Sequence, residues 1–353
     1  MRIAQVSPLF EAVPPKLYGG TERVVWWLTE ELVQMGHDVT LFASGDSVTS
    51  AKLDPMIAQA IRLDPSVRDW IAYYIRMMEL IRRRADEFDV IHFHTDYFPF
   101  SLFSRQPTPF VTTMHGRLDL PEFKMVYETF LDVPLVSISD NQRLPLPRQN
   151  WAKTVHHGMP AELLMPQPVK QEYFAFLGRI SPEKGVDRAI RVAAKCGMKL
   201  KIAAKVDNAD KDYYENEIKP LIAQGHVEFI GEINDAQKPA FLSGAAALMF
   251  PIDWPEPFGL VMIESMACGT PVVAYRHGSV PEVIDHGLTG FVIDPDDEDA
   301  FVAAAKQAHT LSRAKVRAQF ERRFTARRMA EDYLLVYERL GARTTPQLRA
   351  VGD

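Results

Sequence analysis

The sequence has few cysteines, no long apolar run and little net charge. Its 353 residues include only two cysteines, Cys196 and Cys268, which are too few for a disulfide framework and fit a reducing compartment better. The formal net charge of −6 argues against a nucleic-acid partner. No apolar run is long enough to cross a membrane, and the first residues lack the charged and apolar regions of a signal peptide. These absences together predict a cytoplasmic protein.

The sequence also lacks the G-x-G-x-x-G fingerprint of nicotinamide dehydrogenases, which argues against that class of enzyme. The expected first strand, residues 2–8, is followed instead by a longer loop that ends in Gly19 and Gly20. Bare backbone amides at these glycines could approach a phosphate or a sugar closely, because no side chain stands in the way. An ordinary helix start explains the same pattern equally well.

Short apolar runs alternate with helical patterns along the chain. The expected strands cover residues 2–8, 37–44, 89–95, 109–115, 134–140 and 153–158 in the first half, and 172–180, 200–206, 227–233, 247–253, 270–275 and 290–294 in the second. The expected helices cover residues 20–36, 68–87, 184–196, 211–223, 235–244, 258–268 and 314–341. This alternation predicts an α/β protein with two successive Rossmann-like units, each with a parallel sheet covered by helices on both faces.

The two units are expected to join near residues 160–171, where prolines and mixed polarity are typical of a linker. The predicted parts are an N-terminal domain, a C-terminal domain, and a helix end with a frayed tail, over residues 1–163, 164–335 and 336–353. The alternative is that residues 160–171 form a surface loop inside one large domain.

The segment 176–190, FLGRISPEKGVDRAI, has the features of a phosphate-binding loop. Arg179 and Lys184 flank an expected helix start, where backbone amides and the helix dipole already favour an anion. Ser181 suits the N-cap, Pro182 suits the first helical turn, and Gly185 allows a close approach. Two such cations could balance a diphosphate in place of a magnesium ion. The alternative is a pair of solvated surface charges.

The segment 251–275, PIDWPEPFGLVMIESMACGTPVVAY, contains two glutamates, Glu256 and Glu264, with seven residues between them. Pro257 suits the start of a helix, which places Glu256 in the loop at its mouth and Glu264 about two turns along. Glu264 lies within an apolar run, so we expect it to be partly buried and bound by hydrogen-bond donors such as ribose hydroxyls. The alternative is one capping and one solvated carboxylate.

These segments resemble glycosyltransferase family four. The segment 251–275 looks like the E-x7-E signature of that family, and GRISPEKG is similar to its donor-phosphate loop. The segment 277–294, HGSVPEVIDHGLTGFVID, resembles the stretch that follows the signature. The resemblance implies a GT-B fold, in which the two Rossmann-like sheets face each other across a cleft. It implies a retaining hexosyltransferase that uses a nucleotide diphosphate sugar and a hydroxyl acceptor, with no metal or other cofactor. On family frequency, UDP-sugars and among them UDP-glucose are the preferred donors.

The resemblance also implies roles for individual residues. The catalytic group comprises Glu256 at the donor sugar, His115 after the fourth strand, and Arg179 and Lys184 on the diphosphate. The other donor-binding residues are Gly19, Gly20, Lys205, Glu232, Ile233, Phe258, Gly259, Leu260 and Glu264, the last of which binds ribose. One departure from the family pattern concerns Lys205, which stands where many relatives have a glycine-rich turn. The implied mechanism is front-face substitution, in which the departing phosphate assists the acceptor hydroxyl.

Several other patterns fit plain structural roles. His92 and His94 alternate like two metal ligands, but the sequence offers no clear third ligand. The acids at 294–299 resemble a metal motif yet precede a helix, where acids complement the dipole. Asp96 fits a loop role or an acceptor contact. The basic run 82–84 fits a solvated face or contact with anionic lipid, so peripheral membrane contact stays an alternative.

Two other functions remain open at this stage. One is a sugar-nucleotide-binding protein without turnover, and the other is a related enzyme such as a nucleotide-sugar epimerase. The complete set of Arg179, Lys184, Glu256 and Glu264 weighs against the first. An assay that compares sugar transfer, donor hydrolysis and epimer formation would distinguish the second from a glycosyltransferase.

Overall fold

In the computed structural model, residues 1–16 and 19–344 are described, and they form two compact units. The first unit comprises Met1–Met159 together with the helix that begins at Ala326, and the second comprises Pro160–Thr325. The division falls just before the proline-rich linker that the sequence predicts. The helix that begins at Ala326 belongs to the first unit, although the sequence analysis places its residues 326–335 in the C-terminal domain. Residues 345–353 of the expected tail lie outside the described part of the chain.

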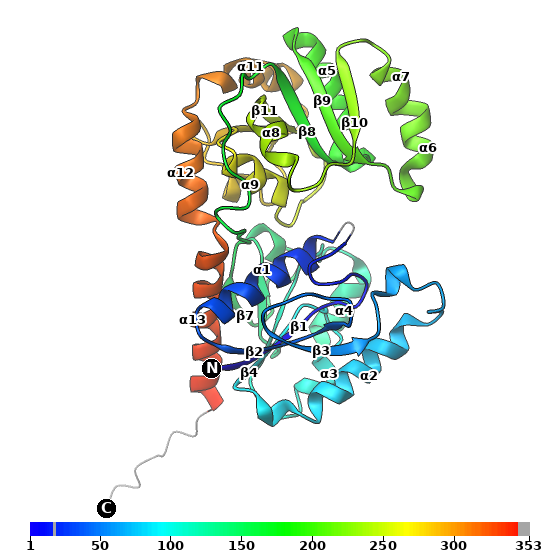
Figure 1. Ribbon diagram of the computed structural model, residues 1–353, viewed down its shortest axis with the longest axis vertical. Coiled ribbons are helices and arrows are strands. Elements are labelled where there is room, and N and C mark those ends of the chain that lie inside the picture. Colours follow the sequence, from blue (N-terminus) through cyan, green and yellow to red (C-terminus); the bar gives the residue numbers. More distant parts are fainter. Residues whose placement is uncertain (17–18, 345–353) are drawn as a thin grey trace, which may run out of the picture. The chain divides into compact units, whose positions relative to one another are not determined.

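The first unit contains a seven-stranded parallel sheet with the strand order β3-β2-β1-β4-β5-β6-β7 (Figure 1). The strands are β1 (Arg2–Val6), β2 (Asp38–Ser44), β3 (Lys52–Ile57), β4 (Val90–Phe93), β5 (Phe110–Thr113), β6 (Leu135–Ser137) and β7 (Trp151–Thr154). From β1 the chain first adds β2 and β3 on one side of the sheet, and it then adds β4 to β7 on the other side. The order of the strands therefore reverses between β1 and β4. In open parallel sheets, ligands bind at such a switch point, outside the carboxyl ends of the strands.

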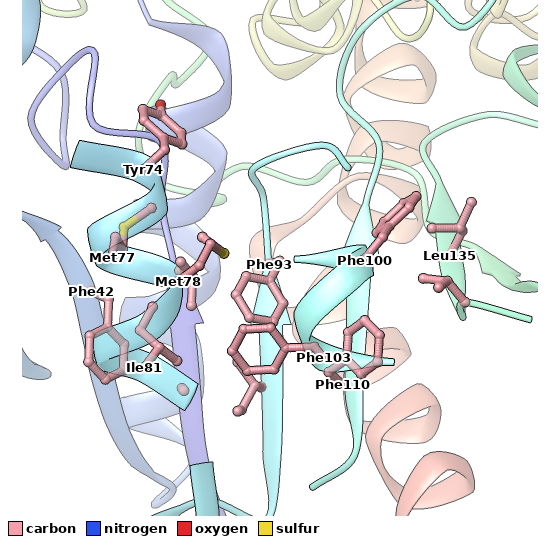
Figure 2. Close-up of a cluster of buried hydrophobic side chains, with 14 of the residues drawn as sticks. Phe42, Tyr74, Met77, Met78, Ile81, Phe93, Phe100, Phe103, Phe110 and Leu135 are labelled. Carbon is pink, nitrogen blue, oxygen red and sulfur yellow. The ribbon is translucent and has the colours of Figure 1, made fainter. Parts of the chain in front are cut away.

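Helices cover both faces of this sheet. They are α1 (Gly20–Gln34), α2 (Trp70–Arg82), α3 (Phe100–Phe103), α4 (Pro121–Thr129) and α13 (Ala326–Thr344). On one face, α2 and α3 pack against Phe42 and Phe93 in a cluster rich in aromatic residues and methionine (Figure 2). On the other face, Val25 of α1 packs against Leu41 and Ala43, and α13 lies beside α1. Alternate residues of β2 therefore serve opposite faces, as the two-residue period of a strand requires.

The edge strand β3 (Lys52–Ile57) is the one strand of this sheet that the sequence analysis did not predict. Pro55 breaks the usual strand pattern, and most of the segment is at least partly exposed. Proline is tolerated in edge strands because one side of the strand has no hydrogen-bonding neighbour. The sequence analysis therefore missed this strand.

The second unit contains a six-stranded parallel sheet with the order β10-β9-β8-β11-β12-β13 (Figure 1). The strands are β8 (Tyr173–Arg179), β9 (Lys199–Lys205), β10 (Val227–Gly231), β11 (Ala245–Phe250), β12 (Val272–Tyr275) and β13 (Gly290–Ile293). All six were predicted. The switch point lies between β8 and β11, which are hydrogen-bonded neighbours. The loops after these two strands therefore meet at the edge where ligands bind.

The helices of the second unit cover this sheet on both faces. The α-helices are α5 (Val186–Cys196), α6 (Lys211–Tyr213), α7 (Lys219–Ile222), α8 (Lys238–Ser243), α9 (Leu260–Ala267), α10 (Val280–Val283), α11 (Glu298–Gln307) and α12 (Arg313–Arg323). A π-helical turn, Tyr214–Ile218, joins α6 to α7. The core includes Ala189 and Ile190 of α5, packed with Phe174 and Phe176 of β8.

The helical pattern at 314–341 is two helices and not the single helix that the periodicity predicts. α12 ends at Arg323, and the non-helical backbone of Phe324 (φ −132°) precedes α13. α12 stays in the second unit, where the Arg317 guanidinium donates to the carbonyl oxygens of Leu164 and Ala267. Within the described ranges, no helix combines the length and the apolar character that crossing a membrane requires.

Candidate active site

The loop after β8 brings the first basic residue to the carboxyl edge of the second sheet. Pro182–Lys184 form one turn of 3-10 helix, and α5 begins only at Val186. Gly185 has a left-handed backbone (φ 68°), and a Cβ there would lie 2.2 Å from the carbonyl oxygen of Pro251. This close approach explains why glycine is needed at position 185, where the loop after β8 meets the loop after β11. Ser181 stands at the predicted N-cap position, before Pro182 in the first turn, but its side chain makes no capping hydrogen bond.

Arg179 ends β8 and lies among three carboxylates. Its guanidinium is 2.7 Å from Glu183, 3.7 Å from Asp207 and 3.6 Å from Asp210. Burial opposes its charge, but these carboxylates raise its pKa further above the ordinary value. The side chain is thus a permanent cation, and protein acids hold it in place.

Lys205 lies next to Arg179, because the register of β8 and β9 pairs these two residues. Its ammonium group is 2.8 Å from Asp207. The departure from the family pattern therefore adds a third positive charge beside the loop. The weaker candidates, Glu232 and Ile233, follow β10, with Glu232 exposed and Ile233 half-buried.

Lys184 and Glu256 form an ion pair that joins the loop after β8 to the loop after β11. The indole Nε1 of Trp254 donates to the same carboxylate at 3.0 Å, and the Lys184 ammonium lies 4.8 Å from the centre of the Trp254 ring. Both charged side chains are largely shielded from solvent. Two residues that the sequence assigns to one site are thus in direct contact.

Glu264 is buried within α9, as the sequence predicts. The Lys238 ammonium at the start of α8 donates to its carboxylate at 2.7 Å and lies 3.0 Å from Asp235. The helix begins at Leu260 and not near Pro257, because Gly259 before it has a left-handed backbone (φ 77°). Phe258 is buried with its ring in the core, so only its backbone is available to a ligand.

The segment after α9 holds the loop that carries Glu256 in place. The Ser279 amide donates to the Glu256 carbonyl at 2.9 Å, and the Ser279 hydroxyl donates to the Phe258 carbonyl at 2.8 Å. A Cβ on Gly278 (φ 54°) would lie 2.3 Å from the Glu256 carbonyl oxygen. Gly278, Ser279, Lys238 and Trp254 were all missed as site residues, although the segment 277–294 was noted for its resemblance.

In the first unit, Gly19 precedes α1 and Gly20 begins it. A Cβ on Gly19 would lie 2.9 Å from both Pro15 Cβ and Glu22 Oε2, so the backbone is closely packed there. Glu22 is buried, and desolvation raises its pKa to about 7, with Glu11 raising it further and Arg62 opposing. An acidic side chain thus lies beside the helix start that the resemblance assigns to phosphates. Residues 17–18 of this loop are outside the described part of the chain.

His115 follows β5 and is half-buried. Its Nε2 is 2.8 Å from Nδ1 of His94, and desolvation lowers its pKa to about 3, so the ring is neutral near pH 7. The Gln142 side chain holds the loop by donating to the carbonyl oxygens of Met114 and Gly116.

Other sequence patterns have structural roles. His92 and His94 are buried and hydrogen-bonded to protein groups, and no group of three or more potential ligands suited to a metal occurs in residues 1–16 and 19–344. Asp297 caps α11 by accepting from the Ala300 amide. The basic run 82–84 is paired with Glu79, Glu87 and Asp54. Asp96 has a left-handed backbone (φ 50°) after β4.

Comparison with known proteins agrees with this arrangement. The family described as "Glycosyltransferase Family 4" matches residues 18–153, and the family described as "Glycosyl transferases group 1" matches residues 165–326. The phosphatidyl-myo-inositol mannosyltransferase of Mycolicibacterium smegmatis is 27% identical, covering 86% of this chain and 83% of that protein.

Two solved structures share the fold. A sucrose-phosphate synthase from Thermosynechococcus elongatus aligns with a TM-score of 0.78 at 20% identity, covering 97% of this chain and 99% of that one. Anabaena HepE in complex with UDP-glucose aligns with a TM-score of 0.72 at 17% identity, covering 97% and 100%. The protein therefore belongs to glycosyltransferase family 4 and is a glycosyltransferase with the GT-B fold of two parallel-sheet units.

Proposed function

We propose that this enzyme transfers a hexose from a nucleotide diphosphate sugar to a hydroxyl group, with retention of the anomeric configuration and without a metal cofactor. UDP-sugars are the preferred donors, with UDP-glucose first. The observation that carries the proposal is the contact of Lys184 with Glu256, because it joins a cation suited to phosphate and an acid suited to sugar hydroxyls. The complex of Anabaena HepE with UDP-glucose supports the donor class.

The charges of the second unit supply what departure of a diphosphate requires. Arg179 and Lys205 place two basic side chains at the paired ends of β8 and β9, and Lys184 adds a third in the turn after β8. Cations fixed in advance where negative charge develops lower the barrier, because they need no reorganisation during the reaction. The leaving phosphate oxygen then takes the proton of the acceptor hydroxyl, while that hydroxyl attacks the same face of the sugar.

Donor binding also requires an exchange of partners. Arg179 and Lys184 are held by Glu183, Asp207, Asp210 and Glu256 in the structure. A diphosphate carries more charge than a single carboxylate and accepts several hydrogen bonds, so it competes effectively for both cations. Release from Lys184 leaves the Glu256 carboxylate free for hydroxyl groups of the sugar. In the first unit, His115, Gly19 and Gly20 stay the candidates for donor contacts.

The test is a transfer and hydrolysis assay with UDP-, GDP- and ADP-glucose, with EDTA present and with product anomers resolved by NMR. We expect activity with UDP-glucose, retention, and no loss on chelation. Arg179→Ala and Lys184→Ala should each lower kcat/KM by about 100-fold or more, as for removal of one preorganised donor. Arg191→Ala, an exposed arginine on α5, is the matched control and should have little effect. Binding without turnover, epimer formation or unchanged kcat/KM in Arg179→Ala would each overturn the proposal.

A further inference from the structure

A continuous chain of hydrogen bonds links His115 to the C-terminal helix of the same unit. His115 Nε2 is 2.8 Å from His94 Nδ1, and His94 Nε2 is 2.9 Å from Gln5 Oε1. The Gln5 amide group donates to the Tyr337 hydroxyl at 3.0 Å. The chain therefore crosses from the loop after β5, past the end of β4 and through β1, to α13, and three of its four members are buried.

The chain continues beyond Tyr337. The Tyr337 hydroxyl is 2.7 Å from His92 Nδ1, and His92 Nε2 is 2.7 Å from the Thr113 hydroxyl. Thr113 in turn lies 2.9 Å from the hydroxyl of Tyr333. Tyr333 and Tyr337 are four residues apart on α13 and so share one face of the helix, and both are fully buried.

The direction of each bond follows from what each atom can do. Oε1 of Gln5 only accepts, so His94 must carry its proton on Nε2. Burial lowers the pKa of His94 well below its ordinary value, so the ring is neutral and its Nδ1 is an acceptor. The proton between the two rings therefore belongs to Nε2 of His115. His115 is neutral as well, so its Nδ1 carries a lone pair, and this atom has no hydrogen-bond partner among the described residues.

We propose that Tyr337 is a positioning residue that acts through Gln5 and His94. It holds His115 in the tautomer with the proton on Nε2, so that Nδ1 can accept a hydrogen bond from a hydroxyl of the sugar substrate. The substrate contact rests on the proposed function, whereas the tautomer does not. The role of Tyr337 is to keep the Gln5 amide in one orientation, because its hydroxyl accepts from Gln5 and passes its own proton to His92.

Removing this hydroxyl has a defined consequence. In Tyr337→Phe the Gln5 amide loses its anchor and can turn over, which places its NH2 group against Nε2 of His94. His94 must then carry its proton on Nδ1, and His115 must carry its proton on Nδ1 as well. Nδ1 of His115, the atom proposed to bind the substrate hydroxyl, would change from an acceptor to a donor. Tyr333→Phe is the matched control, because Tyr333 ends the chain and lies outside the part between Tyr337 and His115.

The experiment is long-range 1H–15N NMR of histidine-labelled full-length protein, with the His115 signals assigned from their loss in His115→Gln. Wild type and Tyr333→Phe should show His115 protonated at Nε2, and Tyr337→Phe should show a mixture of tautomers. In sugar transfer, Tyr337→Phe should lower kcat by about two- to tenfold, the worth of one hydrogen bond, while Tyr333→Phe changes it less than about twofold.

Three results would overturn the inference: an Nδ1-protonated His115 in wild type, an unchanged tautomer in Tyr337→Phe, or equal shifts in both tyrosine variants. Gln5→Leu interrupts the same chain nearer to His115 and should give the same mixture, so the test stays decisive if Tyr337→Phe does not fold. If His115 is protonated at Nε2 but the protein transfers no sugar, only the proposed function is contradicted. If the protein transfers sugar but His115 is protonated at Nδ1, only this inference is contradicted.

Discussion

The ammonium group of Lys238 donates to the carboxylate of Glu264 at 2.7 Å, and both side chains are almost entirely buried. A buried carboxylate is tolerated only when a partner satisfies it. Lys238 therefore satisfies the buried acid of the apolar helix α9, where the proposed function places ribose recognition.

We predict that Lys238→Met lowers the free energy of unfolding by about 3 kcal/mol, because it leaves an unpaired buried charge. Adding Glu264→Gln to this variant should restore most of the loss, since the remaining side chain is neutral. Urea unfolding monitored by circular dichroism measures both effects. Lys219→Met, at an exposed pair with Glu215, is the control and should change stability by less than about 0.5 kcal/mol. An unchanged stability in Lys238→Met would contradict this account.

Gly278→Ala should displace the glutamate loop. Its new Cβ would meet backbone atoms of Glu256 at 2.3 and 2.4 Å, which cannot yield without moving the loop. Gly287 also has a positive φ (78°), but a Cβ there meets nothing within 4 Å. Each alanine costs about 1–2 kcal/mol of backbone strain, and only Gly278→Ala adds a steric clash. We expect kcat/KM for sugar transfer to fall in Gly278→Ala and to stay near wild type in Gly287→Ala. Equal activities in the two variants would rule out this role of Gly278.

Asp210→Asn should strengthen binding of a nucleoside diphosphate. Asp210 lies 3.6 Å from the Arg179 guanidinium and competes with phosphate for it. Loss of this partner should lower the Kd for UDP by about two- to fivefold, within the range that such ion pairs contribute. Isothermal titration calorimetry gives the value, and the difference should shrink at high salt. Weaker binding in Asp210→Asn would show that the carboxylate serves the ligand instead of opposing it.

Glu22 makes stability depend on pH. Because burial raises the pKa of Glu22 from 4.5 to about 7, the folded state binds a proton that the unfolded state releases. The stabilisation from this proton is complete below pH 4.5 and is lost as the pH rises through 7. Between these pH values the free energy of unfolding of the wild type should fall by about 3 kcal/mol relative to that of Glu22→Gln. Urea unfolding at pH 5 and pH 8 measures the difference, with Glu122→Gln, exposed in the first turn of α4, as the control. Parallel pH profiles for wild type and Glu22→Gln would contradict the shift.

Much of the fold could be predicted because buried parallel strands are short apolar runs separated by helical patterns. β3 escaped because an edge strand with Pro55 has no such run. The break between α12 and α13 escaped because Phe324 interrupts the backbone without interrupting the hydrophobic period.

The candidate site was predicted only in part. The charged residues of the two loops stand out in the sequence, and Lys184 and Glu256 do meet. The residues that hold these loops in place do not stand out in the sequence. Lys238 is far from Glu264 along the chain, and Gly278, which packs against the backbone of Glu256, has no polar side chain. The chain from His115 to Tyr337 joins four separate elements and is visible only in three dimensions.

The most direct measurement of the central claim is a crystal structure of the protein with UDP-glucose, grown in the presence of EDTA. We predict diphosphate oxygens within hydrogen-bonding distance of Arg179 and Lys184, ribose hydroxyls at Glu264, and sugar hydroxyls at Glu256. A diphosphate bound away from both cations, or a donor that binds only when a divalent metal bridges it to the protein, would contradict the account.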